Sequence, residues 1–179
     1  QYVVSQDPKC LADLDRLIFP GVGEARSAMD VLKAKNLDVM IQEFAASGKP
    51  LLGICLGCQI LMTLSEERET GCLDIFPGKV RKFPKGTGLK IPHMGWNQVW
   101  HKGRHRIFDG IPDGVSFYFV HSYYVECGEE DLEICTTDYG LDFTSGIARK
   151  NVIAFQFHPE KSGEYGLKLL DNFLQMEDF

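Results

Sequence analysis

The sequence has neither an excess of basic residues nor a long uninterrupted apolar run. Its 179 residues include 19 lysines and arginines against 25 aspartates and glutamates, which gives a formal charge of −6. Proteins that bind DNA or RNA electrostatically need a basic surface, so this net negative charge argues against a nucleic-acid partner. The longest apolar stretch, residues 51–64, is interrupted by glycines and a glutamine. It falls short of the roughly 20 apolar residues that span a bilayer, so we expect no membrane segment.

A secretion signal and a disulfide framework are also lacking. The first eight residues show no basic region and no apolar segment. The chain has six cysteines, but a chain of this length can build a core without disulfides, so we predict reduced thiols and a cytoplasmic location. Cys55 and Cys58 form a Cys-x-x-Cys pair with no second pair elsewhere, which argues against a zinc ribbon. We expect Cys58 in the core, and we predict no metal and no other cofactor.

Short apolar runs alternate with helical patterns in the first half of the chain, and strand patterns dominate the second half. Helices are predicted over residues 25–35, 37–47, 56–64 and 163–175. Strands are predicted at residues 2–4, 17–19, 51–54, 79–83, 98–100, 115–120, 132–136, 143–148 and 152–157. This order predicts an α/β fold with a mostly parallel central sheet, helices on both faces and antiparallel additions. Because no linker or repeat is visible, we predict one domain over residues 1–179.

One cysteine lies between two glycines where a predicted strand turns into a predicted helix. Residues 53–57 read Gly-Ile-Cys-Leu-Gly, with Cys55 at the centre. The spacing matches the nucleophile elbow Gly-x-Ser-x-Gly, with sulfur in place of oxygen. Glycine has no Cβ atom to block so tight a turn, and a merely structural thiol would need neither glycine. The pattern therefore indicates covalent catalysis by a Cys55 thiolate.

Another predicted strand end carries a histidine and a carboxylate. His158, Pro159 and Glu160 follow the apolar strand at residues 152–157, and Pro159 restricts the backbone of His158. A free thiol is only a few per cent ionised at neutral pH, so Cys55 needs a base, and the base needs a group that orients it. We therefore predict a triad of Cys55, His158 and Glu160. We expect His158 and the helix start to lower the thiol pKa to about 3.5–7.5.

Acyl chemistry also needs N–H donors for a developing oxyanion. The amide of Leu56, directly after the nucleophile, is one candidate. The Pro-Gly-Val-Gly turn at residues 20–23 ends the strand predicted at 17–19 and offers a second amide from a neighbouring strand end. No Gly-Lys-Ser/Thr follows this turn, so it is not a phosphate loop.

Taken together, these segments resemble the class I, or triad, glutamine amidotransferases. The matching segments are PGVG at residues 20–23, GICLGCQ at 53–59 and FHPE at 157–160. Within that class the chain is similar to the glutaminase subunits of imidazole glycerol phosphate synthases, through IPHMGWN at 91–97, FVHSY at 119–123 and HPEKSG at 158–163. The likeness covers almost the whole chain and implies the flavodoxin-like fold of that class.

The resemblance implies a role for each matching residue. Cys55 would attack the side-chain amide carbon of glutamine, His158 would move the proton, and Glu160 would orient His158. The amides of Val22 and Leu56 would form the oxyanion hole. The residues implied to hold the glutamine, with Glu67 opposite its α-ammonium group, are Gly21, Gly23, Gln59, Glu67, Ser122 and Tyr123.

A partner protein is implied as well. Ammonia would pass unreleased to a (β/α)₈-barrel cyclase, which makes imidazole glycerol phosphate and an aminoimidazole carboxamide ribotide in histidine biosynthesis. The residues that would border this heterodimer interface are Met94, Gly95, Trp96 and Asn97. We expect the cyclase to accelerate glutamine hydrolysis, because the turn at residues 20–23 would need the partner to align its amide.

Two departures from the family pattern keep alternatives open. Cys58 stands where the family usually has methionine, and the chain begins near the usual second strand, so we expect a strand–helix unit of roughly 25–30 residues to be missing. One alternative is the glutaminase subunit of a different synthase. Another is an inactive, truncated subunit that only binds a cyclase. A third is a cysteine hydrolase of related fold that acts on γ-glutamyl peptides.

Overall fold

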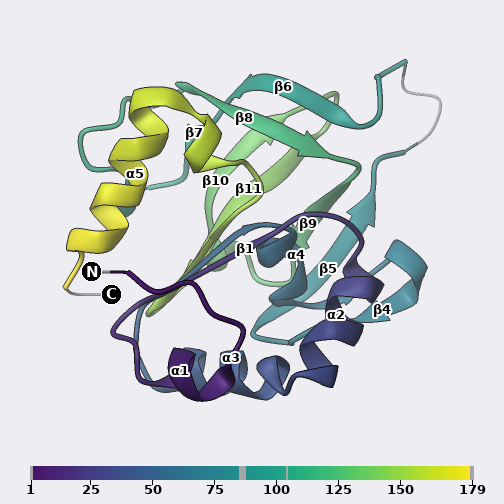
Figure 1. Cartoon of the computed structure of the whole chain (residues 1–179). Coiled ribbons are helices and arrows are strands. Elements are labelled where there is room, and N and C mark those ends of the chain that lie inside the picture. Colours follow the sequence, from purple (N-terminus) through teal and green to yellow (C-terminus); the bar gives the residue numbers. More distant parts are fainter. Residues whose placement is uncertain (1, 85–87, 104, 178–179) are drawn as a thin grey trace.

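The computed structural model describes residues 2–84, 88–103 and 105–177 (Figure 1). The α-helices are α1 (Pro8–Ala12), α2 (Ala25–Ala34), α3 (Leu37–Ala46), α4 (Leu56–Ile60) and α5 (Gly163–Gln175). The strands of the first half are β1 (Leu17–Gly21), β2 (Leu51–Cys55), β3 (Met62–Ser65), β4 (Thr70–Gly71) and β5 (Phe76–Lys82). Those of the second half are β6 (His93–Gln98), β7 (Trp100–His101), β8 (Ser116–His121), β9 (Tyr123–Cys127), β10 (Glu133–Asp138), β11 (Asp142–Arg149) and β12 (Val152–Phe155).

A parallel group of three strands lies at one side of the large sheet. The sheet order is β1-β2-β12-β11-β9-β5-β3-β4. Strand β10 also pairs with β11, and β7 pairs with β10. Both β1 and β12 pair with β2 in parallel, whereas β11 pairs with β12 in antiparallel orientation. The carboxyl ends of β1, β2 and β12 therefore meet at one edge, where ligands bind in open α/β sheets. These ends lead into the three segments whose sequence patterns indicate catalysis.

The large sheet separates two apolar cores. Alternate residues of a strand point to opposite faces, so Leu51 packs with the residues of helices α1 to α4 and Leu52 packs on the other side. The second core contains Leu169 and Phe173 of α5 together with Phe117 of β8. Figure 1 shows α1, α2 and α3 on one side of the sheet and α5 on the other. The predicted α/β fold with helices on both faces and antiparallel additions is confirmed. Among the described residues, the parallel pairs of the large sheet are β1 with β2, β2 with β12 and β3 with β5, and the remaining pairs are antiparallel.

Several predicted elements differ from the structure. Residues 2–4 form no strand, and Tyr2 and Val4 are about nine-tenths exposed. The helix predicted over residues 56–64 ends at Ile60, because the next residues pair with β5 as strand β3. Strand β9 and most of β6 have no counterpart among the predicted strands. Within the described residues, β6 and β8 form a separate two-stranded antiparallel sheet above the large sheet.

The two-stranded β6–β8 sheet anchors the segment that follows β12. The backbone N–H of His158 donates to the Tyr118 carbonyl of β8 at 2.9 Å. The Ser162 hydroxyl accepts from the Tyr118 N–H and donates to the His158 carbonyl. Three hydrogen bonds thus hold the backbone around His158 against β8. In the part of the chain that the structure describes, no helix has the length and apolar character needed to cross a bilayer.

Candidate active site

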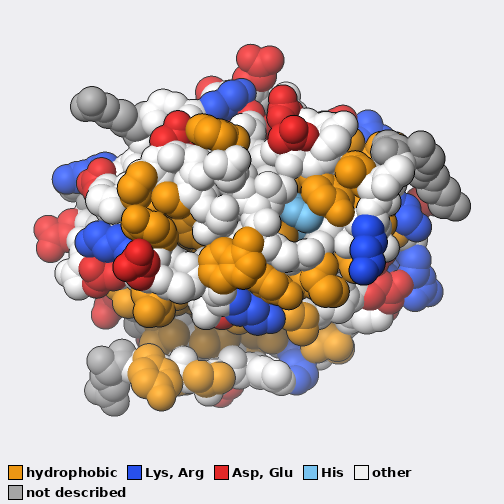
Figure 2. Space-filling view, turned by 90° about the horizontal axis from the view of Figure 1, so that it is seen from above, with side chains coloured by type: hydrophobic (Ala, Val, Ile, Leu, Met, Phe, Trp, Pro, Cys, Tyr) orange, Lys and Arg blue, Asp and Glu red, His pale blue; other side chains and the backbone are white. Residues whose placement is uncertain are grey.

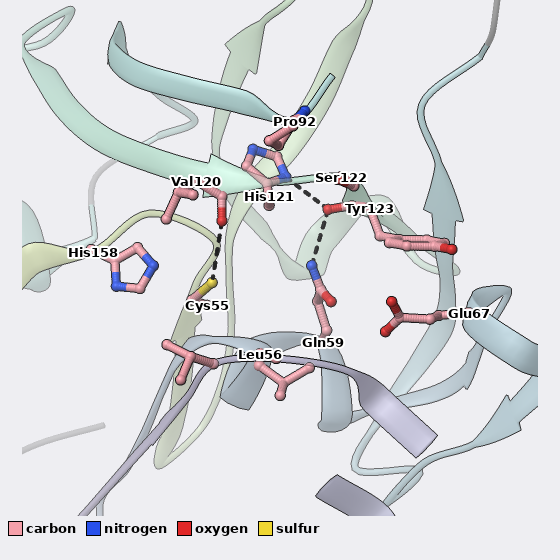
Figure 3. Close-up of a pocket in the computed structure, with 12 residues that line it drawn as sticks. Cys55, Leu56, Gln59, Glu67, Pro92, Val120, His121, Ser122, Tyr123 and His158 are labelled. Carbon is pink, nitrogen blue, oxygen red and sulfur yellow. Dashed lines mark hydrogen bonds between the residues drawn. The ribbon is translucent and has the colours of Figure 1, made fainter. Parts of the chain in front are cut away.

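A cavity of about 350 Å³ opens at the carboxyl ends of β1 and β2 (Figure 3). Its lining residues are Val22, Gly23, Cys55, Leu56, Gln59, Glu67, Pro92, Val120, His121, Ser122, Tyr123 and His158. The structure therefore brings together Cys55, His158 and most of the residues predicted for the oxyanion hole and for glutamine. Gly21 directly precedes the lining residue Val22, and Glu160 is hydrogen-bonded to the lining residue His158. The four predicted interface residues lie outside the cavity on β6.

The turn around Cys55 depends on its two glycines. Cys55 has a φ of 53° and a ψ of −109°, a backbone conformation that a residue with a side chain rarely adopts. A Cβ on Gly57 would lie 2.0 Å from the Phe19 carbonyl oxygen of β1. A Cβ on Gly53 would lie 2.8 Å from the Leu61 side chain. Helix α4 can therefore begin this close to β1 only because Gly57 lacks a Cβ atom, and Gly53 leaves room on β2 for the Leu61 side chain.

The thiol of Cys55 is buried and neutral. Burial raises its pKa from 9.0 to about 11, which outweighs the lowering by the N–H of Leu56. Glu160 raises the pKa further, while Lys161 and Gln156 lower it. This direction is opposite to the lowered pKa that we expected from the sequence, because a thiolate loses hydration when its residue, Cys55, is only 7% exposed. The thiol donates toward the Val120 carbonyl, with sulfur and oxygen 4.0 Å apart (Figure 3).

One ring nitrogen of His158 is hydrogen-bonded to the Glu160 carboxylate, and the other has no hydrogen-bond partner among the described residues. Nδ1 of His158 lies 2.7 Å from Oε1 of Glu160, and a carboxylate accepts, so Nδ1 carries the hydrogen. In the neutral ring Nε2 then holds a lone pair. This nitrogen is buried, and none of the described residues forms a hydrogen bond with it. Its chemistry is that of an oriented base beside a cavity.

Two predicted glutamine contacts are held by other parts of the chain. The amide nitrogen of Gln59 donates to the Tyr123 carbonyl at 3.0 Å, as Figure 3 shows. One carboxylate oxygen of Glu67 accepts the N–H of Ala25, at the start of α2, at 2.7 Å. The Oε1 atom of Gln59 and the second oxygen of Glu67 remain as polar groups at the cavity. Together they offer acceptors for a ligand that carries N–H groups.

The turn after β1 is the most exposed part of the predicted oxyanion hole. Gly21 lies opposite Cys55 in the parallel pairing of β1 and β2. The next residue, Val22, is 79% exposed, and Gly23 has a φ of +100°. The Leu56 amide, in contrast, begins a buried helix and already acts on the sulfur. The two predicted donors therefore differ in how firmly the chain holds them.

Strand β6 exposes two large apolar side chains, those of Met94 and Trp96, beside the cavity. Met94 and Trp96 are 61% and 58% exposed, and Gly95 between them has a φ of 132°. Asn97 is half-buried and donates to the Asp138 carbonyl at 2.8 Å. Figure 2 shows hydrophobic side chains gathered on this upper face, with a histidine visible in a hollow. Exposed large apolar side chains of this kind are typical of a protein–protein contact.

Gln156 is a site residue that the sequence patterns did not predict. It is fully buried between Gln59 and Cys55, and its amide nitrogen lies 3.8 Å from the Cys55 sulfur. The available signal was a single glutamine inside the apolar run at residues 152–157. Val120 and Pro92, which also line the cavity, lie in the matching segments at 119–123 and 91–97, but neither had a predicted role in the active site. Among the described residues, no group of three or more His, Cys, Asp or Glu side chains is arranged to hold a metal ion.

Comparisons with known proteins assign the chain to a protein family. The family model described as "Glutamine amidotransferase class-I" matches residues 5–176. The chain is 48% identical over 177 residues to the imidazole glycerol phosphate synthase subunit HisH of Dehalococcoides mccartyi strain CBDB1, covering 98% of the chain and 85% of that protein. It is 50% identical over 176 residues to the subunit of the same name from Methanosarcina acetivorans, covering 97% of the chain and 85% of that protein.

Solved structures share the fold at lower sequence identity. A structure titled as glutamine amidotransferase matches with a TM-score of 0.69 and 18% identity, covering 94% of the chain and 84% of that protein. A glutamine amidotransferase from Thermotoga maritima matches with a TM-score of 0.65 and 18% identity, covering 92% of the chain and 64% of that protein. At these identities the likeness supports the fold alone.

Proposed function

The chain belongs to the class I glutamine amidotransferase family, and on this premise we propose that it is the glutaminase subunit of an imidazole glycerol phosphate synthase. In this role it hydrolyses glutamine to glutamate and ammonia for histidine biosynthesis. The observation that carries the proposal is the buried, unpartnered Nε2 of His158 at the cavity that contains the Cys55 thiol. Glu160 holds the other ring nitrogen, so the base is already oriented.

The proposed reaction starts from the neutral thiol. His158 Nε2 takes the Cys55 proton as the sulfur forms a bond to the side-chain amide carbon of glutamine. The resulting imidazolium is stabilised by Glu160 and gives its proton to the departing ammonia, which leaves a γ-glutamyl thioester. Water then hydrolyses the thioester, with His158 as the base, and releases glutamate and the thiol.

The proposed oxyanion hole consists of the amides of Leu56 and Val22. Each well-placed donor contributes roughly 3–4 kcal/mol of transition-state stabilisation, so a misplaced donor slows the reaction strongly. Leu56 is fixed at the start of α4, whereas Val22 lies in an exposed turn beside Gly23. We propose that binding of a partner protein aligns the Val22 amide and thereby accelerates hydrolysis.

The proposed glutamine site lies between α4 and the segment after β3. The second carboxylate oxygen of Glu67 faces the α-ammonium group of glutamine, and Oε1 of Gln59 accepts from it. The remaining proposed contacts come from the turn after β1 and from the β8–β9 connection: Gly21, Gly23, Ser122 and Tyr123. These groups recognise a free amino acid rather than a peptide, because they surround its ammonium end.

The proposed partner is a (β/α)₈-barrel cyclase that receives the ammonia without release to solvent. Met94, Gly95, Trp96 and Asn97 form the proposed border of this heterodimer interface. Exposed Met94 and Trp96 beside the cavity support this assignment. We further propose one amidotransferase domain, a cytoplasmic location, and a lyase activity that belongs to the assembled synthase.

Mixing the chain with the purified cyclase of an imidazole glycerol phosphate synthase, together with the nucleotide substrate of that cyclase, tests the proposal. We expect slow glutamate release by the chain alone and at least tenfold acceleration in the mixture. Cys55→Ala in the same mixture should abolish glutamine-dependent synthesis and leave ammonia-dependent synthesis intact. A chain that binds the cyclase without hydrolysing glutamine would be an inactive binding protein. Hydrolysis that no cyclase accelerates would point to a different synthase or a γ-glutamyl hydrolase.

A further inference from the structure

A second glutamine lies directly behind the Cys55 sulfur. Gln156 follows β12, is fully buried, and comes two residues before His158. Its backbone N–H donates to the Ser145 carbonyl of β11 at 2.9 Å, which fixes the position of its main chain. Its side-chain amide lies between Gln59 and Cys55, at 2.9 Å from Gln59 Nε2 and 3.8 Å from the sulfur. The backbone thus holds this buried amide beside the nucleophile.

The orientation of the Gln156 amide follows from a backbone carbonyl. Gln59 approaches the Tyr123 carbonyl at 3.0 Å, and a carbonyl can only accept, so Gln59 must place its NH₂ group there. The same NH₂ group meets Gln156, which must therefore present its oxygen to Gln59. The NH₂ group of Gln156 then points to the Cys55 sulfur. Reversal of either amide would set two donors or two acceptors against each other.

Two buried histidines, His121 and His93, continue this series of donor and acceptor assignments from the Tyr123 carbonyl toward strand β6. Nδ1 of His121 lies 2.7 Å from the same Tyr123 carbonyl, so it carries the hydrogen and its Nε2 accepts. Nε2 of His121 lies 2.9 Å from Nδ1 of His93, which must donate. Burial lowers the pKa of His93 to about 4 and that of His121 to about 3, so both rings are neutral at pH 7. Each ring therefore carries a single N–H.

The chain of hydrogen bonds ends on strand β6. Because Nδ1 of His93 donates, its Nε2 must accept, and Asn97 Nδ2 lies 3.3 Å away. The same Asn97 nitrogen donates to the Asp138 carbonyl, which assigns the NH₂ group to this end independently. Donor and acceptor roles are thus consistent from Asn97 to the sulfur. Two backbone carbonyls, those of Asp138 and Tyr123, determine all of them.

We propose that Gln156 is a further catalytic residue of the proposed glutaminase, which holds an amide N–H against the Cys55 sulfur in an orientation set by the Tyr123 carbonyl through Gln59. This inference rests on the proposed function, since the sulfur must become a thiolate or an attacking nucleophile. A buried thiolate has lost its water, and an N–H donor replaces part of that hydration. His121 and His93 are positioning residues, because they contact the sulfur's neighbours only through the Tyr123 carbonyl that also accepts from Gln59.

The first test measures thiolate formation and does not depend on glutaminase activity. Iodoacetamide reacts with the thiolate, so the Cys55 modification rate against pH, resolved by peptide mass spectrometry, gives the titration midpoint. Gln156→Leu and Gln156→Met both remove the donor without adding charge. We expect the midpoint to rise by about one pH unit in both variants.

Ser145→Ala is the matched control. The Ser145 hydroxyl donates to another buried sulfur, that of Cys135, at 3.4 Å. This variant therefore loses the same kind of hydrogen bond one strand away, and its Cys55 midpoint should stay at the wild-type value. Circular dichroism checks that each variant is folded. An unchanged Cys55 midpoint in folded Gln156→Leu would overturn the proposal.

Steady-state kinetics separate this inference from the proposed function. If the wild-type chain with cyclase hydrolyses glutamine, Gln156→Leu should lower kcat about tenfold and change KM for glutamine less than threefold. A loss confined to KM would mean that Gln156 only shapes the substrate site, and would overturn the catalytic role. If the wild-type chain shows no glutaminase activity, the proposed function fails, while the alkylation midpoints still decide whether Gln156 stabilises the thiolate.

Nuclear magnetic resonance tests the same geometry in the unmodified chain, whatever the stability of the variants. Ring ¹⁵N shifts should report an Nδ1–H tautomer for both His93 and His121. The side-chain NH₂ of Gln156 should show nuclear Overhauser contacts to the Cys55 β protons. Contacts from this NH₂ group to Gln59 alone would contradict the assigned orientation of the Gln156 amide and overturn the proposal.

Discussion

Substitution of Gly57 by alanine tests whether the contact between α4 and β1 builds the site. A methyl group at residue 57 would lie 2.0 Å from the Phe19 carbonyl oxygen, against a limit of about 3.0 Å for real contacts. The neighbouring atom belongs to the backbone, so β1 and α4 must separate by about 1 Å. Overpacking of this kind costs typically 1–3 kcal/mol. For a chain of this length each kcal/mol lowers Tm by about 2–4 °C, so we expect a decrease of about 2–12 °C.

The decrease in kcat should be larger than partial unfolding of the variant can explain. Phe19 and Gly21 belong to the same strand, so a displaced β1 also displaces the turn that carries the Val22 amide. Loss of one oxyanion donor lowers kcat by about 10²–10³. The assays are thermal unfolding by circular dichroism and glutamate release in the presence of the cyclase, with kcat measured well below the Tm of the variant.

Gly71→Ala is the matched control for Gly57→Ala. A Cβ at Gly71 would meet nothing within 4 Å, so this variant should keep its activity and show no decrease in Tm. The reduced freedom of the unfolded chain should raise its stability by about 0.4–1 kcal/mol. If Gly57→Ala unfolds and hydrolyses glutamine as the wild-type chain does, the reasoning about this contact is wrong.

Three further results are expected. The Cys55 alkylation rate in the isolated chain should rise about tenfold per pH unit from pH 7 to 10, because its pKa is about 11, and a plateau below pH 9 would contradict this. Glu160→Gln should lower kcat by about 10²–10⁴ in the glutamate-release assay with little change in Tm, and an unchanged kcat would remove Glu160 from the mechanism. His121 has a folded pKa of about 3, below its ordinary 6.5, so its stabilising contribution is complete above pH 6.5 and is lost as pH falls toward 3. Urea unfolding should show a loss of about 1.4 kcal/mol per pH unit in this window, and His121→Phe should remove that part of the slope.

The sequence by itself was sufficient for features that depend on neighbours a few residues apart. The elbow at Cys55 follows from glycines two residues on either side, which permit the tight turn. Glu160 reaches His158 within a single turn, so their pairing is a local property. The alternation of apolar runs also predicted the α/β fold, because burial of one face or both follows from period and length.

Only the tertiary structure decided which distant groups meet and in what electrostatic surroundings. Gln156 contacts a sulfur 101 residues away, and Gln59 meets a carbonyl 64 residues away, because the strand order places them together. The helix predicted through residue 64 stops at Ile60, since pairing with β5 outweighs the local helical pattern. The direction of the Cys55 pKa shift depends on burial by the whole fold. Hydration and long-range pairing arise from packing of the complete chain, and no short window of sequence contains them.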